Sequence, residues 1–271
     1  MTARILTCLV LAAAGCMQRD VALRVATLNL AHGRGSALSQ IGLPPSTFEA
    51  NLHAVAAVLL RERPDVLAVQ EADAECFWSG RFDHVERLAG AGELPHRFHG
   101  LHVNTRTLNR PLRYGTALLS RLHLSDTVSH AFRLDALDTK GYVAADIERG
   151  GRRLCVVSVH LDFRFERTRR RQADAMVEAL RSRGRPMIVM GDFNCDWSAA
   201  DDGLRRTAAG LDLRAFRPED DGLRTFPSNA PARRLDWILI SPDIEFRDYR
   251  CWPDVLSDHL GVTAEIVIRR L

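Results

Sequence analysis

The chain has 271 residues, 46% of them hydrophobic, and a formal net charge of +3 at pH 7. That is enough apolar material for one good-sized domain, and the near balance of charge argues against a strongly basic protein that wraps nucleic acid. No linker, low-complexity segment or short repeat interrupts the sequence, so we expect one domain over residues 21–271, preceded by an N-terminal signal.

Residues 1–15 have the composition of an export signal. A single arginine, Arg4, precedes an apolar run that is too short to cross a bilayer. Cysteine directly after Ala14–Gly15 resembles a bacterial lipobox, in which Cys16 becomes the lipidated mature N-terminus, although Ala13 stands where that pattern usually has Leu. An ordinary export signal and a buried N-terminal strand are the alternatives. We therefore expect an exported protein, either periplasmic or anchored to a membrane through lipid on Cys16.

Four further cysteines show no metal-binding pattern. None lies in a CxxC pair or has the Cys/His spacing of a zinc site. Cys155 lies in an apolar run and is expected in the core. Exported proteins can form disulfides, but the sequence leaves open how these residues pair: Cys76, Cys155, Cys195 and Cys251.

The first half of the chain predicts a strand, a helix and a second strand. An apolar run at 25–28 ends in Asn29, and another at 65–69 ends in Gln70–Glu71. Between them, a Ser–Thr–Phe–Glu sequence at 46–49 reads as a capping box that opens a helix with apolar residues on one face. Both strands therefore deliver polar groups to their carboxyl ends.

The middle of the chain predicts short strands and then the same unit again. The short strands are expected at 114–120, 122–132 and 142–148. A run at 154–159 then ends in His160, an amphipathic helix covers about 167–183, and a run at 186–190 ends in Gly191–Asp192–Phe193–Asn194. The two halves thus look like one strand–helix–strand unit used twice.

The last part of the chain predicts three strands and another polar cluster. Asp236 lies inside a strand at 235–240, a strand follows at 244–251, and Ser257–Asp258–His259 immediately precedes a final strand at 260–268. Buried carboxylates and amides are costly unless they bind a metal, a proton or a substrate. We therefore expect the polar strand ends to meet at one edge of a sheet scaffold. For the segment that ends in Asn194 alone, an Asx turn is the alternative.

These residues, in this order, resemble the endonuclease/exonuclease/phosphatase superfamily, which includes deoxyribonucleases, apurinic endonucleases, neutral sphingomyelinases and inositol polyphosphate 5-phosphatases. The more specific matching segments are GDFN and SDH. The full set is TLN (27–29), VQE (69–71), YGTALLSR (114–121), SVHLD (158–162), GDFN (191–194), RLDWILIS (234–241) and SDH (257–259). The resemblance implies an α/β fold in which two facing mixed sheets are flanked by helices as a four-layer sandwich. The pattern of elements alone does not separate this from a doubly wound sheet.

The resemblance also implies a divalent metal. Asn29 and Glu71 supply hard oxygen ligands that suit Mg²⁺, with Mn²⁺ as an alternative, and Asp258 would assist. A solvated strand-end acid and a turn residue are the alternatives for Glu71 and Asn29. Ala31 stands where the apurinic-endonuclease pattern has an acid or amide. The chain is therefore more similar to the phosphatase and sphingomyelinase branches.

The predicted catalytic roles centre on Asp192. This carboxylate would orient and deprotonate the attacking water, and Asn194 would fix the phosphate or the same water. His259 would stabilise charge on the phosphoryl oxygens, and Asp236 would hold its imidazole ring in the right tautomer. Ser257 has no G-x-S-x-G context, so we expect no covalent nucleophile.

Four further residues complete the predicted site. His160 would hydrogen-bond a non-bridging oxygen, and Tyr114 would reach the same phosphate. Arg169 and Gln172 fit a family spacing, and they would brace the site or bind an anionic headgroup. The run of arginines at 164–171 reads as a solvated helix start, with nucleic-acid binding as the alternative. We interpret the other histidines as ordinary: His32, His53, His84, His96, His99, His102, His123 and His130.

The sequence therefore predicts a metal-dependent hydrolase of phosphate esters, with phosphodiesters of lipid or small-molecule type as the preferred substrates. An extracytoplasmic, metal-dependent endo- or exonuclease is the second hypothesis, which nicking of DNA would distinguish. The third is a catalytically inactive binding module on the same fold, which the joint presence of the site residues opposes. Specificity would lie in loops at 72–92, 101–113 and 197–228, and we expect a monomer.

Overall fold

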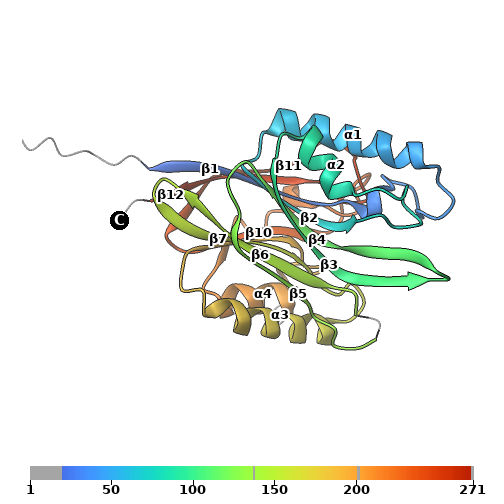
Figure 1. Cartoon of the computed structure of the whole chain (residues 1–271). Coiled ribbons are helices and arrows are strands. Elements are labelled where there is room, and N and C mark those ends of the chain that lie inside the picture. The colour runs from blue at the N-terminus through green and yellow to red at the C-terminus, as the bar shows by residue number, and fades with distance from the viewer. Residues whose placement is uncertain (1–19, 137, 200–201, 270–271) are drawn as a thin grey trace, which may run out of the picture.

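The computed structural model describes residues 20–136, 138–199 and 202–269 (Figure 1). The predicted signal and Cys16 lie outside these residues. Two six-stranded mixed sheets face each other and are covered on their outer faces by helices. The predicted four-layer α/β sandwich is thus confirmed.

The first sheet contains both the N-terminal and the C-terminal strands. Its order is β11 (Ile244–Cys251), β12 (Val262–Ile268), β1 (Val21–Asn29), β2 (Val66–Asp73), β4 (Arg110–Ser120) and β3 (His96–Thr107). Two helices cover its outer face, α1 (Pro45–Glu62) and α2 (His84–Ala91) (Figure 1). A short 3-10 turn, η1 (Ala31–Gly33), follows β1 directly.

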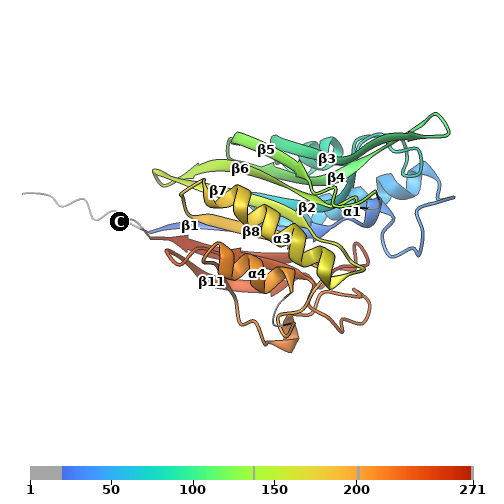
Figure 2. The same cartoon turned by 90° about the horizontal axis from the view of Figure 1, so that it is seen from below.

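The second sheet is built from the middle of the chain. Its order is β5 (Ser125–Ala131), β6 (Gly141–Arg149), β7 (Arg152–His160), β8 (Met187–Asp192), β10 (Asp236–Ile240) and β9 (Arg214–Ala215). Figure 2 shows α3 (Glu166–Arg181) and α4 (Gly203–Gly210) side by side on its outer face. A second 3-10 turn, η2 (Asp221–Leu223), lies in the connection between β9 and β10.

Alternating side chains of the central strands divide the core into three layers. Val25 and Ala68 point into the layer between the two sheets, whereas Leu28 and Leu67 point toward α1 and α2. Val157 in the second sheet faces α3 and α4 in the same way. Strands buried on both faces read as continuous apolar runs, which is why these strands could be located from the sequence.

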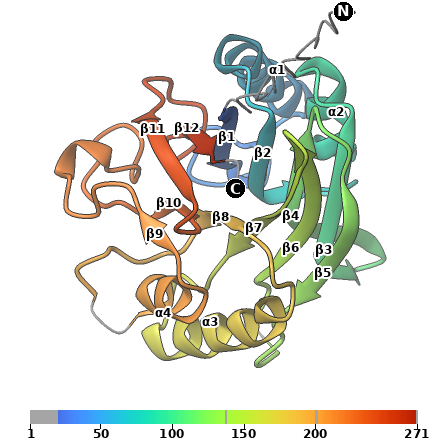
Figure 3. The same ribbon diagram turned by 90° about the vertical axis from the view of Figure 1, so that its left-hand side faces the viewer.

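The two halves of the chain form the same parallel unit, as expected. β1 and β2 pair in parallel around α1, and β7 and β8 pair in parallel around α3. Each pair occupies the third and fourth positions of its sheet. Viewed along the strands, the two sheets face each other across the molecule (Figure 3). In this arrangement the carboxyl ends of all four strands lie at one edge of the sandwich.

Several boundaries and loops differ from the prediction. The helix α1 begins at Pro45 with no side-chain cap, so the expected capping box is not formed. The segments expected to be loops contain α2, β3 with the start of β4, and α4. The sequence of β3 is mostly polar because β3 is an edge strand, and its extended backbone depends on pairing with β4.

The four cysteines in the described part of the chain are all free thiols, and Cys155 is buried in the core as expected. No helix among the described residues is long and apolar enough to cross a membrane.

Candidate active site

A cavity of about 380 Å³ opens where the strands of the two parallel units end. Seven residues predicted from the sequence line it: Asn29, Glu71, His160, Asp192, Asn194, Asp258 and His259. Further lining residues that the sequence did not single out include Arg34, Lys140, Phe163 and Phe226. The register explains the convergence, because Asn29 is level with Gln70 in one sheet and His160 is level with Asp192 in the other.

The backbone around this cavity is strained at several residues. Ala31, His32, Glu71 and Asn194 all have positive φ, at 47°, 54°, 49° and 54°. Such conformations cost about 1–3 kcal/mol each for non-glycine residues and persist only where the surrounding structure imposes them. Glu71 and Asn194 line the cavity, whereas Ala31 and His32 lie in the turn that follows β1.

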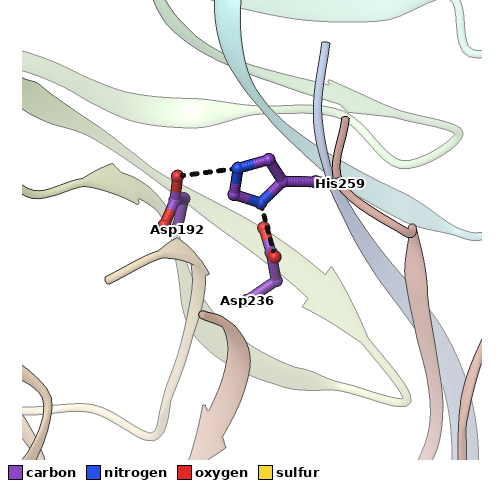
Figure 4. A group of neighbouring side chains, drawn as sticks. All are labelled: Asp192, Asp236 and His259. Carbon is purple, nitrogen blue, oxygen red and sulfur yellow. Dashed lines mark hydrogen bonds and ion pairs between the residues drawn. The ribbon is translucent and has the colours of Figure 1, made fainter. Parts of the chain in front are cut away.

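Asp192, His259 and Asp236 form a buried carboxylate–imidazole–carboxylate array (Figure 4). Nδ1 of His259 donates to Oδ2 of Asp236 at 2.8 Å, and its Nε2 lies 3.8 Å from Oδ2 of Asp192. The hydroxyl of Thr225 also donates to Oδ2 of Asp236, at 2.6 Å. The imidazole ring of His259 therefore lies between the two carboxyl groups, with Nδ1 bonded to Asp236 and the Nε2 edge facing Asp192.

Burial and mutual charge shift the pKa of both members that face the cavity. Burial raises the pKa of Asp192 to about 6, helped by the neighbouring Asp236 charge and opposed by His259 and Lys140. For His259, burial would lower the pKa, but the charges of Asp236 and Asp192 outweigh it and raise the pKa to about 10. At neutral pH the imidazole is therefore protonated, and the carboxyl group of Asp192 is a base with a pKa close to neutrality.

Two asparagines hold Asp192 in place. The side-chain amide of Asn29 donates to Oδ2 of Asp192 at 3.0 Å, and its carbonyl oxygen accepts from the backbone of Ala31 at 2.9 Å. The backbone of Asn194 donates to Oδ1 of Asp192 at 2.9 Å, and its side chain donates to the backbone oxygen of Leu161. The side chain of Asn29 thus contacts Asp192 through its amide, while its carbonyl oxygen, the atom that a metal would bind, is bonded to the backbone of Ala31.

Lys140 supplies a cation that the sequence analysis missed. Its Nζ lies 2.9 Å from Nε2 of His160 and 3.6 Å from Oε1 of Glu71, and the residue is only 9% exposed. Burial and the charge of Lys140 hold the pKa of His160 well below its usual value. The imidazole is thus neutral and the ammonium carries the charge. The available signal was that Lys140 is the only lysine in an arginine-rich chain.

Glu71 lies in a strongly cationic environment. Its carboxylate is 3.5 Å from Nε2 of His32, 3.6 Å from Lys140 and 3.8 Å from Arg34. Burial would raise the pKa of Glu71, but these charges together hold it far below its usual range. Arg34 also pairs with Asp258, so one guanidinium links the two carboxylates. The guanidinium of Arg34 is thus a cation shared by two carboxylates. Carboxylate oxygens are also the ligands that a hard divalent metal prefers.

His32 is a correction to the sequence analysis, which left it as an ordinary histidine. Its Nδ1 lies 2.6 Å from Oδ1 of Asp73, while Nε2 faces Glu71. Burial opposes protonation, but Asp73 and Glu71 raise the pKa of His32. The ring thus connects a buried carboxylate to the predicted metal ligand, as partners of metal-binding carboxylates commonly do.

Two groups of side chains could hold a metal. Ligand atoms of Asp192, Asp236 and His259 lie within 4.8 Å of one another. An ion there would have to replace the hydrogen bond between His259 and Asp236, and Mg²⁺ prefers oxygen over imidazole nitrogen. Glu71 and Asp258 offer two further carboxylates at the cavity, and an ion there would have to replace Arg34, which pairs with both. Each group thus offers carboxylate oxygens of the kind that a divalent cation binds.

Four predicted site residues of the described chain do not line the cavity, and one of them, Asp236, lies against His259. The ring of Tyr114 packs edge-on against His32 at 5.0 Å between centroids and is not part of the cavity lining. Arg169 is paired with Asp202 at 2.8 Å. Gln172 is fully buried and donates to Asp138 at 2.9 Å. For Arg169 and Gln172 the bracing role fits these contacts, and headgroup binding does not.

The fold and the site together define a class of protein: a two-sheet α/β sandwich whose strand ends carry a buried carboxylate–imidazole–carboxylate array. The chain belongs to the Endonuclease/Exonuclease/phosphatase family, whose sequence profile matches residues 26–259. Members of this family hydrolyse phosphate esters, typically with a divalent metal.

Named relatives agree with this placement. The Escherichia coli K12 protein named "Uncharacterized protein YbhP" is 31% identical over 161 residues. That match covers 56% of this chain and 62% of the relative, so the chain spans less than two thirds of that protein's length.

Solved structures of low identity share the fold. An endonuclease/exonuclease/phosphatase from Beutenbergia cavernae has a TM-score of 0.69 at 19% identity, covering 92% of this chain and 72% of that one. The human Nocturnin catalytic domain with bound sulfate has a TM-score of 0.66 at 20% identity, and the match covers 90% of this chain and 94% of that one. A mannosyl-6-phosphatase of Bacteroides thetaiotaomicron has a TM-score of 0.63 at 17% identity, and the match covers 91% of this chain and 100% of that one. At these identities the likeness is one of fold.

Proposed function

We propose that the protein hydrolyses phosphate esters, with Mg²⁺ as its preferred metal and Mn²⁺ as an alternative. The observation that carries the proposal is the buried array of Asp192, His259 and Asp236 beside Lys140 at one cavity. A carboxylate base next to a protonated imidazole and an ammonium matches the needs of phosphoryl transfer. That reaction requires a positioned water and positive charge around the phosphoryl oxygens.

The chemistry begins at the carboxylate of Asp192, which Asn29 and Asn194 hold in place. This carboxylate accepts a proton from the attacking water. The water oxygen forms the new bond to phosphorus as the bond from phosphorus to the ester oxygen breaks. Nε2 of His259 donates to a non-bridging oxygen, and its Nδ1 stays bonded to Asp236.

Lys140 and His160 act beside Asp192, since Nε2 of His160 lies 3.3 Å from Oδ2 of Asp192. The ammonium of Lys140 neutralises charge on a second non-bridging oxygen, and His160, held neutral beside it, fixes the direction of that ammonium. When bound at Glu71 and Asp258, the divalent cation supplies further positive charge for the phosphoryl and leaving oxygens.

For the substrate, we propose a phosphodiester of lipid or small-molecule type over nucleic acid. The cavity is small, at about 380 Å³, and Phe163 and Phe226 form part of its wall. Duplex binding needs several phosphate contacts from free cations. Three of the five arginines at 164–171 have acidic partners: Arg164 pairs with Asp162, Arg169 with Asp202 and Arg170 with Glu166. These arginines are the surface that a nuclease would use to contact the phosphates of nucleic acid.

The deciding experiment incubates the purified chain with Mg²⁺ and a panel of supercoiled plasmid, single-stranded DNA, sphingomyelin, phosphatidylinositol phosphates and simple mono- and diesters. Asp192→Asn, which keeps the side-chain shape, is the blank. We expect turnover of a lipid or small ester that falls by about 10²- to 10⁴-fold in the variant, the usual contribution of a general base. Plasmid nicking would move the protein to the nuclease branch. Lack of any turnover would favour an inactive binding module.

The metal is tested separately. EDTA should abolish turnover and excess Mg²⁺ should restore it. Binding of Mn²⁺, followed by calorimetry, should weaken in Glu71→Gln and stay unchanged in Asp236→Asn if the ion sits at Glu71 and Asp258. If Mn²⁺ binding weakens in Asp236→Asn and stays unchanged in Glu71→Gln, the ion belongs in the Asp192–Asp236–His259 group. Activity that persists in EDTA would remove the metal from the mechanism.

We also propose that the protein is exported and carries lipid on Cys16. The proposal is supported by the Ala14–Gly15–Cys16 sequence. Labelling of expressing cells with a palmitate analogue should mark the protein, and Cys16→Ala should abolish the label. An unlabelled protein found in the soluble periplasmic fraction would indicate an ordinary export signal.

A further inference from the structure

Phe163 is an unusually exposed aromatic side chain for a residue beside a buried site. It is 66% exposed, and its ring forms part of the cavity wall. Phe165, two residues further on, is 61% exposed but does not line the cavity. Large aromatic side chains left exposed at a cavity commonly serve binding, since exposure forfeits the free energy that their burial would give.

The loop that carries Phe163 is held rigidly on both sides. The buried carboxylate of Asp162 accepts from the backbone of Arg164 and Phe165 at 2.9 and 2.8 Å. The backbone of Asp162 donates to Gln172 at 2.8 Å and accepts from Arg169 at 3.2 Å. A side chain on a loop fixed by these four hydrogen bonds is presented to solvent in one place. This reduces the entropy lost when a ligand packs against it.

The ring lies beside the place where the phosphate would bind. Nζ of Lys140 is 5.7 Å from the centroid of the Phe163 ring and 2.9 Å from Nε2 of His160. A phosphate held by Lys140 and His160 therefore has the Phe163 ring as its neighbour. Any group esterified to that phosphate and directed along this wall meets the ring first.

Resting on the proposed function, we infer that Phe163 is a specificity-determining residue that stacks a flat aromatic ring esterified close to the phosphate. The preferred substrates then carry an aryl group or a nucleobase. The flat π-face is the shared chemistry, since aromatic side chains stack any such ring without reading hydrogen-bond donors or acceptors. Lys140 adds to the preference, because its ammonium approaches the same aromatic wall.

The test measures binding, so it does not depend on turnover. Titration calorimetry in Mg²⁺ compares phenylphosphonate with cyclohexylphosphonate, which match in size while only the first is flat. Phe163→Leu keeps an apolar side chain but removes the ring. It should weaken binding of phenylphosphonate by about tenfold, in the range known for stacking on aromatic side chains. Binding of cyclohexylphosphonate should change less than twofold, and Phe163→Trp should retain the preference.

Phe165→Leu is the matched control, an exposed phenylalanine on the same loop that does not line the cavity. It should leave both affinities unchanged. Thymidine 5′-methylphosphonate distinguishes a nucleobase from a simple aryl group. If Phe163→Leu weakens the binding of this ligand more than that of phenylphosphonate, the preferred ring is a nucleobase. An equal loss for the phenyl and cyclohexyl ligands, or none, would overturn the inference. Selective binding without turnover of any ester would instead overturn the proposed function.

Discussion

His259 is the residue whose ionisation depends most directly on its neighbours in the site. Burial would lower its pKa, and two carboxylates raise it to about 10, while the pKa of Asp192 is raised to about 6. Activity requires Asp192 as the base and His259 as the cation. The rate should therefore rise with pH up to about 6 and fall as pH passes about 10.

A variant tests which charge sets the alkaline limit. Asp236→Asn removes the charge that raises the pKa of His259 most, so the alkaline fall should move to lower pH. It also removes a charge that raises the pKa of Asp192, so the acid limb should move to lower pH as well. The measurement is a pH profile of kcat/KM for both proteins. An alkaline limb that stays in place would show that His259 does not need its proton.

Lys140 makes a second prediction at the residue scale. After burial, its charge is the largest cause that holds the pKa of His160 low. In Lys140→Gln, the pKa of His160 should therefore rise toward the ordinary value of about 6.5. NMR titration of the imidazole signals would measure this directly. An unchanged pKa would mean that the ammonium does not face His160 in solution, and the proposed phosphate contact would lose its support.

At the scale of elements, Gln172 on α3 joins two loops that reach the site. Its side-chain carbonyl accepts from the backbone of Asp162, and its amide donates to Asp138. The carboxylate of Asp138 in turn accepts from the backbone of Lys140 at 3.1 Å. One buried amide thus positions both the loop with Phe163 and the turn with Lys140.

Removing this amide should affect stability and activity together. Gln172→Met leaves buried partners at Asp162 and Asp138 without a hydrogen bond. The free energy of unfolding should therefore fall by about 1–3 kcal/mol. Urea denaturation measures this loss, and kcat/KM should fall as well because both loops shift. Arg171→Ala, at an exposed position of the same helix, serves as the control. Equal behaviour of the two variants would contradict the bracing role.

The elements also show which features the sequence can and cannot predict. The strands that end at Asn29 and Asp192 were recognisable because they are apolar on both faces and then abruptly polar. β3 was missed because an edge strand with polar residues has no such pattern, and its pairing with β4 decides its conformation. Lys140 and His32 were missed for a related reason. Their roles arise from neighbours far along the chain, at His160 and Asp73.

At the scale of the whole molecule, a polar layer crosses the core between the sheets beneath the site. Gln70 of the first sheet donates to Ser158 of the second at 3.1 Å, and Ser158 donates to the backbone of Val69 at 3.0 Å. Thr116 and His102 continue the layer, joined by a 2.9 Å hydrogen bond. Nδ1 of His102 has no hydrogen-bond partner. Buried polar groups that are paired across the sheets fix one relative position of the packed layers, which an apolar core alone would specify less strictly.

His102 links this layer to the stability of the whole molecule. Burial, helped by the cationic side chains of Lys140 and Arg133, lowers its pKa to about 3, whereas an unfolded histidine has a pKa of about 6.5. Between these values the unfolded chain binds a proton that the folded protein does not. The free energy of unfolding must therefore decrease as pH falls below about 6.5, by up to about 1.4 kcal/mol per pH unit from this residue.

His259 acts in the opposite direction, because its raised pKa stabilises the folded state below about 6.5 and this contribution is lost as pH rises toward 10. His102→Gln can still bond Thr116 but cannot titrate. Its urea midpoint should therefore fall less steeply than that of the unmodified protein between pH 7 and pH 5. His53→Gln, at an exposed position of α1, controls for the loss of a histidine as such. If the slope in His102→Gln matches that control, His102 is charged in the folded protein, and the two sheets pack less tightly around it than the structure describes.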